Sequence, residues 1–233
     1  QDIEFTIQEG KLWMLQTRVG KRNGVSAIKI AVDMFNENMI DKKTAIMRVK
    51  PNQLDELLHP ALDKASEESA TKLTKGLPAG PGGAKGRVVF TADDAEEWNR
   101  KGEKVILVRE ETSPEDVHGM HAAEAILTAR GGMTSHAALV ARGWGKCCIV
   151  GCNEINISIE NKQLTVGEVV VKEGDWITMN GTLGVVYLGQ LKLIPADPDR
   201  NIEYKELMTW ADEIRKLKIR TNAESPEDSK QAI

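Results

Sequence analysis

The chain has 233 residues, enough for one sizeable hydrophobic core with flanking elements. Its 31 Lys and Arg residues against 35 Asp and Glu residues give a formal net charge of −4. This mildly acidic balance, without a basic stripe or an arginine-rich tail, argues against nucleic acid as a partner. No apolar run approaches the roughly 18 residues of a membrane-spanning helix, and the first five residues lack the pattern of a signal peptide. We therefore expect an intracellular protein with no membrane partner.

Short alternating runs at the N-terminus, residues 2–7 and 11–18, predict a β-hairpin. Two strands alone are marginal in water, so this segment reads as a piece of a larger sheet. Residues 25–58 carry apolar side chains at helical spacing. Residues 64–75 are polar, which favours a solvated linker or the end of a surface helix.

A dense cluster of glycine and proline at residues 76–86 predicts the start of a new unit. Strands and helices then alternate, which is typical of an α/β unit. The predicted strands are 87–90, 104–108, 125–128 and 147–150. The predicted helices are 92–101, one that begins at Pro114 with Ser113 as its N-cap, and 134–142. Residues to about 188 read mostly as β-structure.

The C-terminal part changes character again. Residues 202–217 have helical spacing, residues 218–223 resemble a strand, and Ser225-Pro226-Glu227-Asp228 has the composition of a helix start. A strand followed by a helix start at this point suggests the beginning of a further domain.

Three cysteines lie close together, at positions 147, 148 and 152. An odd number with an adjacent pair does not suggest a disulfide framework, and the spacing is poor for zinc. We interpret them as reduced thiols on a buried strand. His118 and His121 share a helix face and could form a metal-binding pair. Because no further ligand is aimed there, we favour surface positions and expect no metal site in the core of this chain.

One run points to chemistry: Gly131-Gly132-Met133-Thr134-Ser135-His136-Ala137-Ala138. With Thr134 as the N-cap, His136 lies in the first turn of a helix, where free N–H groups and the helix dipole favour negative charge. Gly132 lets a phosphate approach the backbone, and the Thr134 and Ser135 hydroxyls can hydrogen-bond phosphoryl oxygens. These features suit a nucleophilic histidine that carries a phosphoryl group. The alternative is a capping threonine beside a surface histidine without function.

This run, together with residues 141–148, 151–152, 76–86 and 112–123, resembles the phosphohistidine domain of the pyruvate, phosphate dikinase family, over nearly the whole chain. The related phosphoenolpyruvate synthases and Enzyme I of the sugar phosphotransferase system tend to carry Arg where Met133 stands, and they lack the cysteine pair. The resemblance implies an α/β fold: a swivelling phosphohistidine β/β/α domain, flanked by helical linker arms and an N-terminal β-hairpin.

The implied domain organisation runs as follows: 1–20, the end of an ATP-grasp domain; 21–75, a helical linker; 76–194, the central phosphohistidine domain; 195–217, a second linker helix; and 218–233, the start of a TIM-barrel domain. The partners implied for this segment are the ATP-grasp and TIM-barrel domains of the same parent chain, which is expected to be a homo-oligomer in the cytoplasm or a plastid.

The activity that the resemblance implies converts ATP, phosphate and pyruvate into AMP, pyrophosphate and phosphoenolpyruvate, with Mg²⁺. His136 would shuttle the phosphoryl group, and Glu4, Gln16 and Arg18 would be residual ATP-site residues. In plant members the threonine at the position of Thr134 is phosphorylated to switch activity off. We expect no complete turnover by this segment alone and no cofactor bound to it. Two alternatives stay open: a phosphoenolpyruvate synthase, and a binding module whose histidine has no chemistry.

Overall fold

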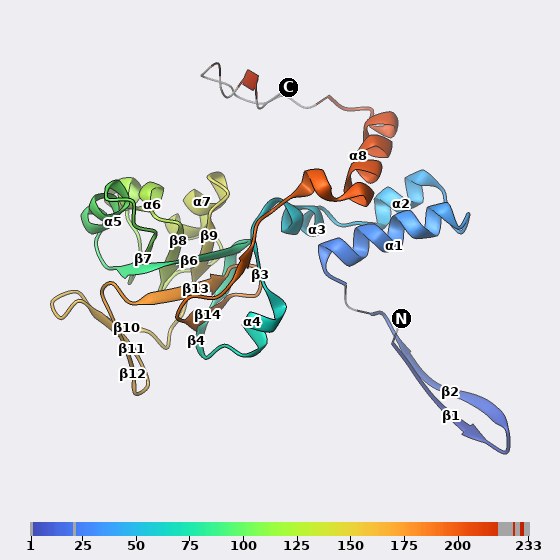
Figure 1. The fold of residues 1–233 in the computed structure, drawn as a ribbon, viewed down its shortest axis with the longest axis horizontal. Coiled ribbons are helices and arrows are strands. Elements are labelled where there is room, and N and C mark those ends of the chain that lie inside the picture. Colours follow the sequence, from blue (N-terminus) through green and yellow to red (C-terminus); the bar gives the residue numbers. More distant parts are fainter. Residues whose placement is uncertain (1, 21, 219–225, 227–228, 231–233) are drawn as a thin grey trace. The chain divides into compact units, whose positions relative to one another are not determined.

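The computed structural model describes residues 2–20, 22–218, 226 and 229–230. It divides into two compact units (Figure 1). We call residues 1–50 and 198–233 the helical unit, and residues 51–197 the sheet unit. Each is described by itself. Among the described residues, no helix is long and apolar enough to cross a membrane.

The helical unit begins with a β-hairpin of β1 (Asp2–Gln8) and β2 (Lys11–Arg18), at nearly the residues that the alternation predicts. Its turn uses Glu9 and Gly10 at φ +53° and +73°, the left-handed region that glycine adopts easily. Every described residue of the two strands is exposed, including Phe5 at 55% and Trp13 at 47%. The two-stranded ribbon therefore has no core of its own.

Three helices pack together in the same unit: α1 (Gly24–Asn36), α2 (Lys42–Arg48) and α8 (Ile202–Ile214). The rings of Phe35 and Trp210 lie 4.4 Å apart between α1 and α8. Lys42 forms an ion pair of 2.7 Å with Glu213, which joins α2 to α8. The segments that precede and follow the sheet unit in the sequence thus fold as one small helical cluster.

An eight-stranded sheet organises the sheet unit, in the order β4-β14-β13-β6-β7-β8-β9-β5. The strands are β4 (Lys72–Lys75), β5 (Leu77–Gly80), β6 (Gly83–Val89), β7 (Val105–Arg109), β8 (Ala125–Thr128), β9 (Cys147–Val150), β13 (Trp176–Asn180) and β14 (Val185–Leu188). The four strands β6 to β9 are parallel, β13 pairs antiparallel with β6, and β5 pairs antiparallel with β9. Strands β14 and β4 continue the sheet beyond β13 in antiparallel pairs.

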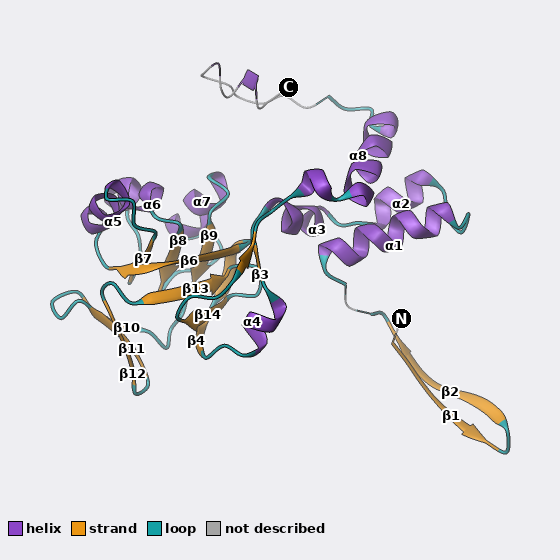
Figure 2. Cartoon of the chain, viewed as in Figure 1, coloured by secondary structure: helices purple, strands orange, loops and turns teal. Residues whose placement is uncertain are grey.

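Three helices connect the parallel strands: α5 (Ala92–Arg100), α6 (Val117–Ala122) and α7 (His136–Gly143). They gather on one side of the sheet (Figure 2). Alternate residues of β7 divide between the two faces: Val105 and Leu107 pack with the helices, whereas Ile106 and Val108 belong to the opposite core. A strand buried on both faces explains why its sequence is apolar without alternation.

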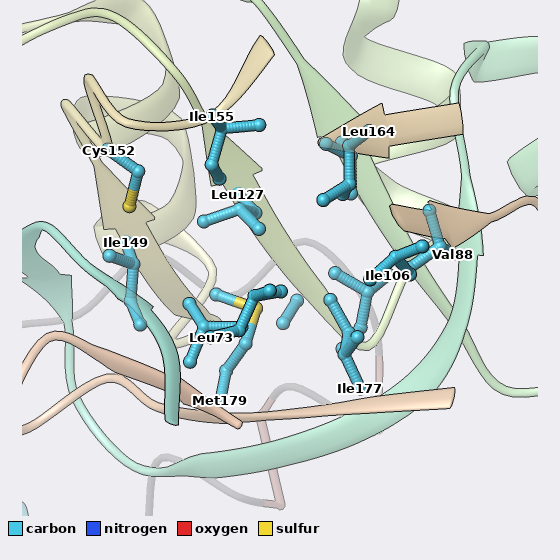
Figure 3. Close-up of a cluster of buried hydrophobic side chains, with 14 of the residues drawn as sticks. Leu73, Val88, Ile106, Leu127, Ile149, Cys152, Ile155, Leu164, Ile177 and Met179 are labelled. Carbon is cyan, nitrogen blue, oxygen red and sulfur yellow. The ribbon is translucent and has the colours of Figure 1, made fainter. Parts of the chain in front are cut away.

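The opposite core (Figure 3) collects side chains from most strands of the sheet. Ile149 from β9 and Met179 from β13 belong to this one cluster, so the two halves of the sheet contribute to the same core. A three-stranded sheet adds to this face through Leu164 and Val171: β10 (Asn156–Ser158), β11 (Gln163–Val166) and β12 (Val169–Lys172).

Short elements complete the chain: α3 (Pro51–Asp55), β3 (Ala61–Leu62), α4 (Lys64–Glu68), β15 (Leu193–Ile194) and the 3-10 turns η1 (Glu56–Leu58), η2 (Pro114–Asp116) and η3 (Pro198–Arg200). Glu67 on α4 accepts hydrogen bonds of 2.7 Å from both Asn180 and Tyr187, which fixes α4 to β13 and β14.

The structure corrects the expected boundary at residues 76–86. The expected helical linker 21–75 is wrong for its second half, because residues 51–75 lie in the sheet unit and β4 pairs with β14. The glycine and proline cluster forms most of β5 and β6 rather than a break. Gly86, for example, leaves no room for a Cβ beside the Val105 backbone. The glycines of residues 76–86 therefore allow neighbouring strands to pack closely. Composition alone does not distinguish this role from that of a linker.

The C-terminal predictions are only partly covered by the structure. Helix α8 ends at Ile214 rather than at residue 217. The strand predicted at 218–223 lies outside the described residues except for residue 218, and so does most of the helix start at 225–228.

Candidate functional site

His136 lies where two loops meet at the carboxyl edge of the parallel strands. The loop after β8 leads into α7, and the loop after β7 carries Thr112. Because β7 and β8 are parallel neighbours, their C-terminal ends lie at the same edge of the sheet. The Thr112 hydroxyl contacts Nδ1 of His136 at 3.0 Å. The contact occupies one ring nitrogen and leaves Nε2 available.

The start of α7 differs by one residue from the expectation. Ser135, not Thr134, is the N-cap: its backbone is extended, and its hydroxyl accepts from the N–H of Ala138 at 3.4 Å. His136 is the first residue of the helix, so it stays in the first turn as predicted. Thr134 lies in the preceding turn and is exposed. The Ser135 N–H donates to the Gly132 carbonyl at 3.0 Å and so ends this turn at Ser135, the residue from which the helix starts.

The two glycines of the motif have different requirements. Gly131 has φ +107°, and a Cβ there would press on the Ser135 side chain at 3.1 Å. Gly132 has an ordinary φ, and a Cβ there would meet nothing within 4 Å. The fold itself therefore does not require glycine at position 132. Open space beside a glycine in front of His136 suits the approach of a ligand or of another protein surface.

The surroundings of His136 are partly apolar. The ring is half-buried, whereas Met133 and Leu139 are 40% and 58% exposed on either side in the sequence. Arg142 fastens the loop to the helix, since its guanidinium donates to the carbonyls of Met133 and Ala138. The imidazole is thus fixed in place but still open to a partner.

The expected ATP-site residues lie together on the hairpin of the helical unit. Arg18 Nη2 donates to Glu4 Oε1 and to Gln16 Oε1, both at 2.8 Å. All three side chains are exposed. Glu4 and Gln16 offer one carboxylate and one amide oxygen, fewer than the six oxygen ligands of Mg²⁺, and both already contact Arg18. The described residues also contain no cluster of three or more His, Cys, Asp or Glu side chains suited to a metal. The residues present do not form a Mg²⁺ site by themselves.

A separate cavity of about 900 Å³ lies at the other edge of the parallel strands, where β8 and β9 begin. His59, His121, Trp144 and Lys146 are among its lining residues, and His136 is not. The His121 ring meets Trp144 edge-on at 5.3 Å, and His118, which also lines the cavity, forms a 3.0 Å contact with Asp93. The two histidines of α6 thus have separate partners rather than a shared one.

The cysteines are free thiols buried in or next to β9, so none is an exposed nucleophile. Burial raises the pKa of Cys147 and of Cys152 from 9.0 to about 12, and it also raises the pKa of Cys148. Cys148 Sγ lies 3.9 Å from the Ala137 carbonyl, beneath the first turn of α7. Its role there is packing.

The raised thiol pKa values predict a loss of stability at alkaline pH. Above pH 9 the unfolded chain ionises its thiols while the folded chain keeps them protonated, so the unfolded state binds fewer protons and the free energy of unfolding falls between pH 9 and pH 12. Urea unfolding at pH 8 and pH 10.5 measures this fall. A variant with Cys147, Cys148 and Cys152 all changed to alanine should lose less stability over the same interval. If both proteins lost the same free energy of unfolding between pH 8 and pH 10.5, the buried thiols would not be the cause of the fall.

The sequence predicts His136 as the candidate residue but does not single out Thr112, which contacts its ring, or Arg142, which holds the preceding loop. Thr112 belongs to the Thr-Ser-Pro-Glu-Asp run that the sequence marks as a helix start. The signal that could have found it is topological: loops that follow neighbouring parallel strands converge.

Comparison with known proteins matches part of the sheet unit to a family. Residues 101–184, which include β7, β8, α7 and His136, match the family described as PEP-utilising enzyme, mobile domain. A solution structure of an Enzyme I protein (nEIt) aligns with 47% of this chain and 38% of that chain at 23% identity, and its TM-score of 0.26 is too low to carry an argument.

Curated relatives match almost the whole chain. Pyruvate, phosphate dikinase 1, chloroplastic, of Arabidopsis thaliana is 57% identical over 98% of this chain and 24% of the relative. The chloroplastic enzyme of Flaveria pringlei is 56% identical with the same coverage. Pyruvate, phosphate dikinase 2 of Oryza sativa subsp. japonica is 55% identical over 98% of this chain and 26% of the relative. The chain therefore belongs to the pyruvate, phosphate dikinase family, in which it spans about a quarter of its relatives' length and carries the mobile domain of PEP-utilising enzymes.

Proposed function

We propose that this chain is the phosphoryl-carrier portion of a pyruvate, phosphate dikinase and that His136 is the carrier. The observation that carries the proposal is the 3.0 Å contact between the Thr112 hydroxyl and Nδ1 at the start of α7. It leaves Nε2 as the nitrogen that takes the phosphoryl group. In the phosphorylated state Nδ1 keeps a proton, and the Thr112 oxygen can accept it in a hydrogen bond.

The transfers balance as three displacements on phosphorus. The Nε2 lone pair attacks the β-phosphorus of ATP, the bond to the oxygen of the α-phosphate breaks, and AMP leaves a pyrophosphohistidine. Inorganic phosphate then attacks the terminal phosphorus, and pyrophosphate leaves a phosphohistidine. Finally the enolate oxygen of pyruvate attacks the phosphorus that remains on His136. The N–P bond breaks, its electrons return to Nε2, and phosphoenolpyruvate forms.

We further propose that the binding groups for both substrates lie in parts of the longer protein beyond these residues, an ATP-grasp domain and a TIM barrel. Exposed apolar side chains on the hairpin and on α7, such as Phe5 and Leu139, support the presence of these further domains, since each offers apolar area for another domain to cover. One histidine that serves two sites requires a moving domain, which fits the mobile-domain match. The isolated segment is then not expected to complete a turnover.

Glu4, Gln16 and Arg18 are proposed as residual ATP-site residues, with Arg18 free to turn from its carboxylate and amide partners toward a phosphate. Mg²⁺ would enter with ATP at groups supplied outside this chain. The plastid names of the relatives from Arabidopsis thaliana and Flaveria pringlei support a plastid or cytoplasmic location. Phosphorylation of exposed Thr134 would place nearly two negative charges two residues from His136 and so repel an incoming phosphate.

The enzyme that contains this chain is expected to require inorganic phosphate. Given ATP, pyruvate and Mg²⁺, it should form phosphoenolpyruvate, AMP and pyrophosphate only when phosphate is added, because phosphate is the acceptor in the second displacement. A coupled assay for phosphoenolpyruvate with and without phosphate measures this. Product formation without added phosphate, with phosphate released, would identify a phosphoenolpyruvate synthase instead and overturn the dikinase proposal.

A further inference from the structure

Asp116 occupies an unusual place beside the His136 site. Its side chain is only 7% exposed, although it lies in the short 3-10 turn η2 between β7 and α6. Buried carboxylates are costly unless they are paired and hydrogen-bonded. Asp116 has both kinds of partner, and each partner leads to a different part of the domain.

On one side Asp116 is tied to the sheet. Its Oδ1 lies 3.3 Å from Nε of Arg109, an ion pair whose geometry falls short of a hydrogen bond. Arg109 is the last residue of β7, and its Nη1 donates to the Phe90 carbonyl at 3.1 Å, just after β6. The carboxylate is thereby held at the carboxyl edge of two neighbouring strands.

On the other side Asp116 fixes the loop that carries Thr112. Its Oδ2 accepts from the Ser113 N–H at 2.8 Å and lies 3.3 Å from the Ser113 hydroxyl. The Ser113 N–H belongs to the peptide unit that joins residues 112 and 113. Fixing that planar unit fixes the position of the Thr112 Cα, and with it the hydroxyl that contacts His136.

We propose that Asp116 is a positioning residue for His136: through Ser113 it holds the Thr112 hydroxyl on Nδ1 and so selects Nε2 as the phosphoryl acceptor. This inference rests on the proposed carrier role of His136. The Thr112 hydroxyl can rotate to donate or accept, but when it accepts from Nδ1–H, the lone pair lies on Nε2. A loop free to shift would release Nδ1 and let the ring exchange its tautomer.

The direct test is the tautomer of His136 in the 233-residue chain labelled with ¹⁵N-histidine. At a pH where the ring is neutral, ¹⁵N shifts should report Nδ1–H as the main form in the wild type. Asp116→Asn should shift the population toward Nε2–H, and Thr112→Val should do the same by removing the hydroxyl itself. The matched control is Asp94→Asn, which removes a capping carboxylate of α5 that accepts from Thr91 at 2.7 Å. It should leave the His136 tautomer unchanged.

A second readout uses the full-length enzyme. Asp116→Asn should lower the rate of His136 phosphorylation by about 10-fold to 100-fold, as expected for a small misplacement of a reacting group. KM for ATP should stay constant, because the nucleotide site lies elsewhere. Asp116→Glu should recover part of the rate. If Asp116→Asn does not fold, the double variant Arg109→Met/Asp116→Asn is used instead, because it removes both charges of the ion pair and leaves no unpaired buried charge. The same change in tautomer and phosphorylation rate is expected of it.

The outcomes separate this inference from the carrier proposal. A folded Asp116→Asn protein with the wild-type tautomer and the wild-type phosphorylation rate would overturn the positioning role while leaving His136 as the carrier. A shifted tautomer in Asp116→Asn, in an enzyme whose wild type never phosphorylates His136, would instead overturn the carrier role. It would leave intact the proposal that Asp116 positions Thr112 against His136.

Discussion

Replacement of His136 by alanine in the full-length enzyme is expected to abolish the acid-labile phosphoryl label that ATP transfers to the protein. The loss should exceed about 10³-fold, since the variant lacks the nucleophile itself. Incubation with ATP labelled at the β-phosphate, followed by a comparison of label retained at neutral pH and after brief acid treatment, measures the effect. The variant should fold normally, because the His136 side chain is half-buried and lies outside both large core clusters.

The matched control for this experiment is His121→Ala. His121 is an exposed histidine of the same domain, and it lines the cavity at the amino-terminal edge of the parallel strands, away from His136. It should retain the full label. Equal acid-labile label in His136→Ala and the wild type would remove the carrier role and favour a binding module.

Gly80→Ala is expected to destabilise the chain by about 3 kcal/mol, at the upper end of the usual cost of overpacking. Gly80 lies in β5 at the edge of the large sheet. A Cβ there would overlap the Lys146 carbonyl oxygen and lie 3.0 Å from the Cys148 nitrogen. These are backbone atoms of β9 and the residue before it, so no side-chain rotation can relieve the overlap. Urea unfolding followed by circular dichroism measures the change.

The control for Gly80→Ala is Gly143→Ala. Gly143 is the last residue of α7, and a Cβ there would meet nothing within 4 Å. Alanine at this position should leave the free energy of unfolding equal or slightly raised, because glycine is a poor helix former. If Gly80→Ala were as stable as Gly143→Ala, the close approach of β5 to the β9 backbone would be wrong.

Local sequence patterns predicted the elements whose causes are local. Strands β8 and β9 were predicted with the bounds that the structure has, since each is a short apolar run between turn residues. Helix α5 was predicted to within one residue, because Thr91 caps it and acidic residues follow in its first turn.

The errors have a different origin. The glycines of β5 and β6 are explained by contacts with β7, β9 and other segments far along the chain, which composition cannot reveal. The same is true of β4: its partner β14 lies more than 100 residues away. A polar, glycine-rich stretch looks like a linker until the strands it pairs with are known.

The candidate site divides in the same way. The diglycine turn, the helix start and His136 follow from one continuous run of sequence, and the structure places them together with the cap moved from Thr134 to Ser135. Thr112 contacts His136 across 24 positions, so its part depends on the parallel pairing of β7 and β8. The network through Asp116 requires side-chain geometry and could not be predicted.

The most direct test of the account is to locate the phosphoryl group itself. The full-length enzyme is incubated with ATP, Mg²⁺ and inorganic phosphate without pyruvate, digested at alkaline pH, and examined by tandem mass spectrometry and by ³¹P–¹⁵N coupling in the histidine-labelled protein. The account predicts an acid-labile phosphoryl group on the peptide that contains His136, with phosphorus bonded to Nε2. Phosphorus on Nδ1, on another residue, or on no residue of this chain would contradict it.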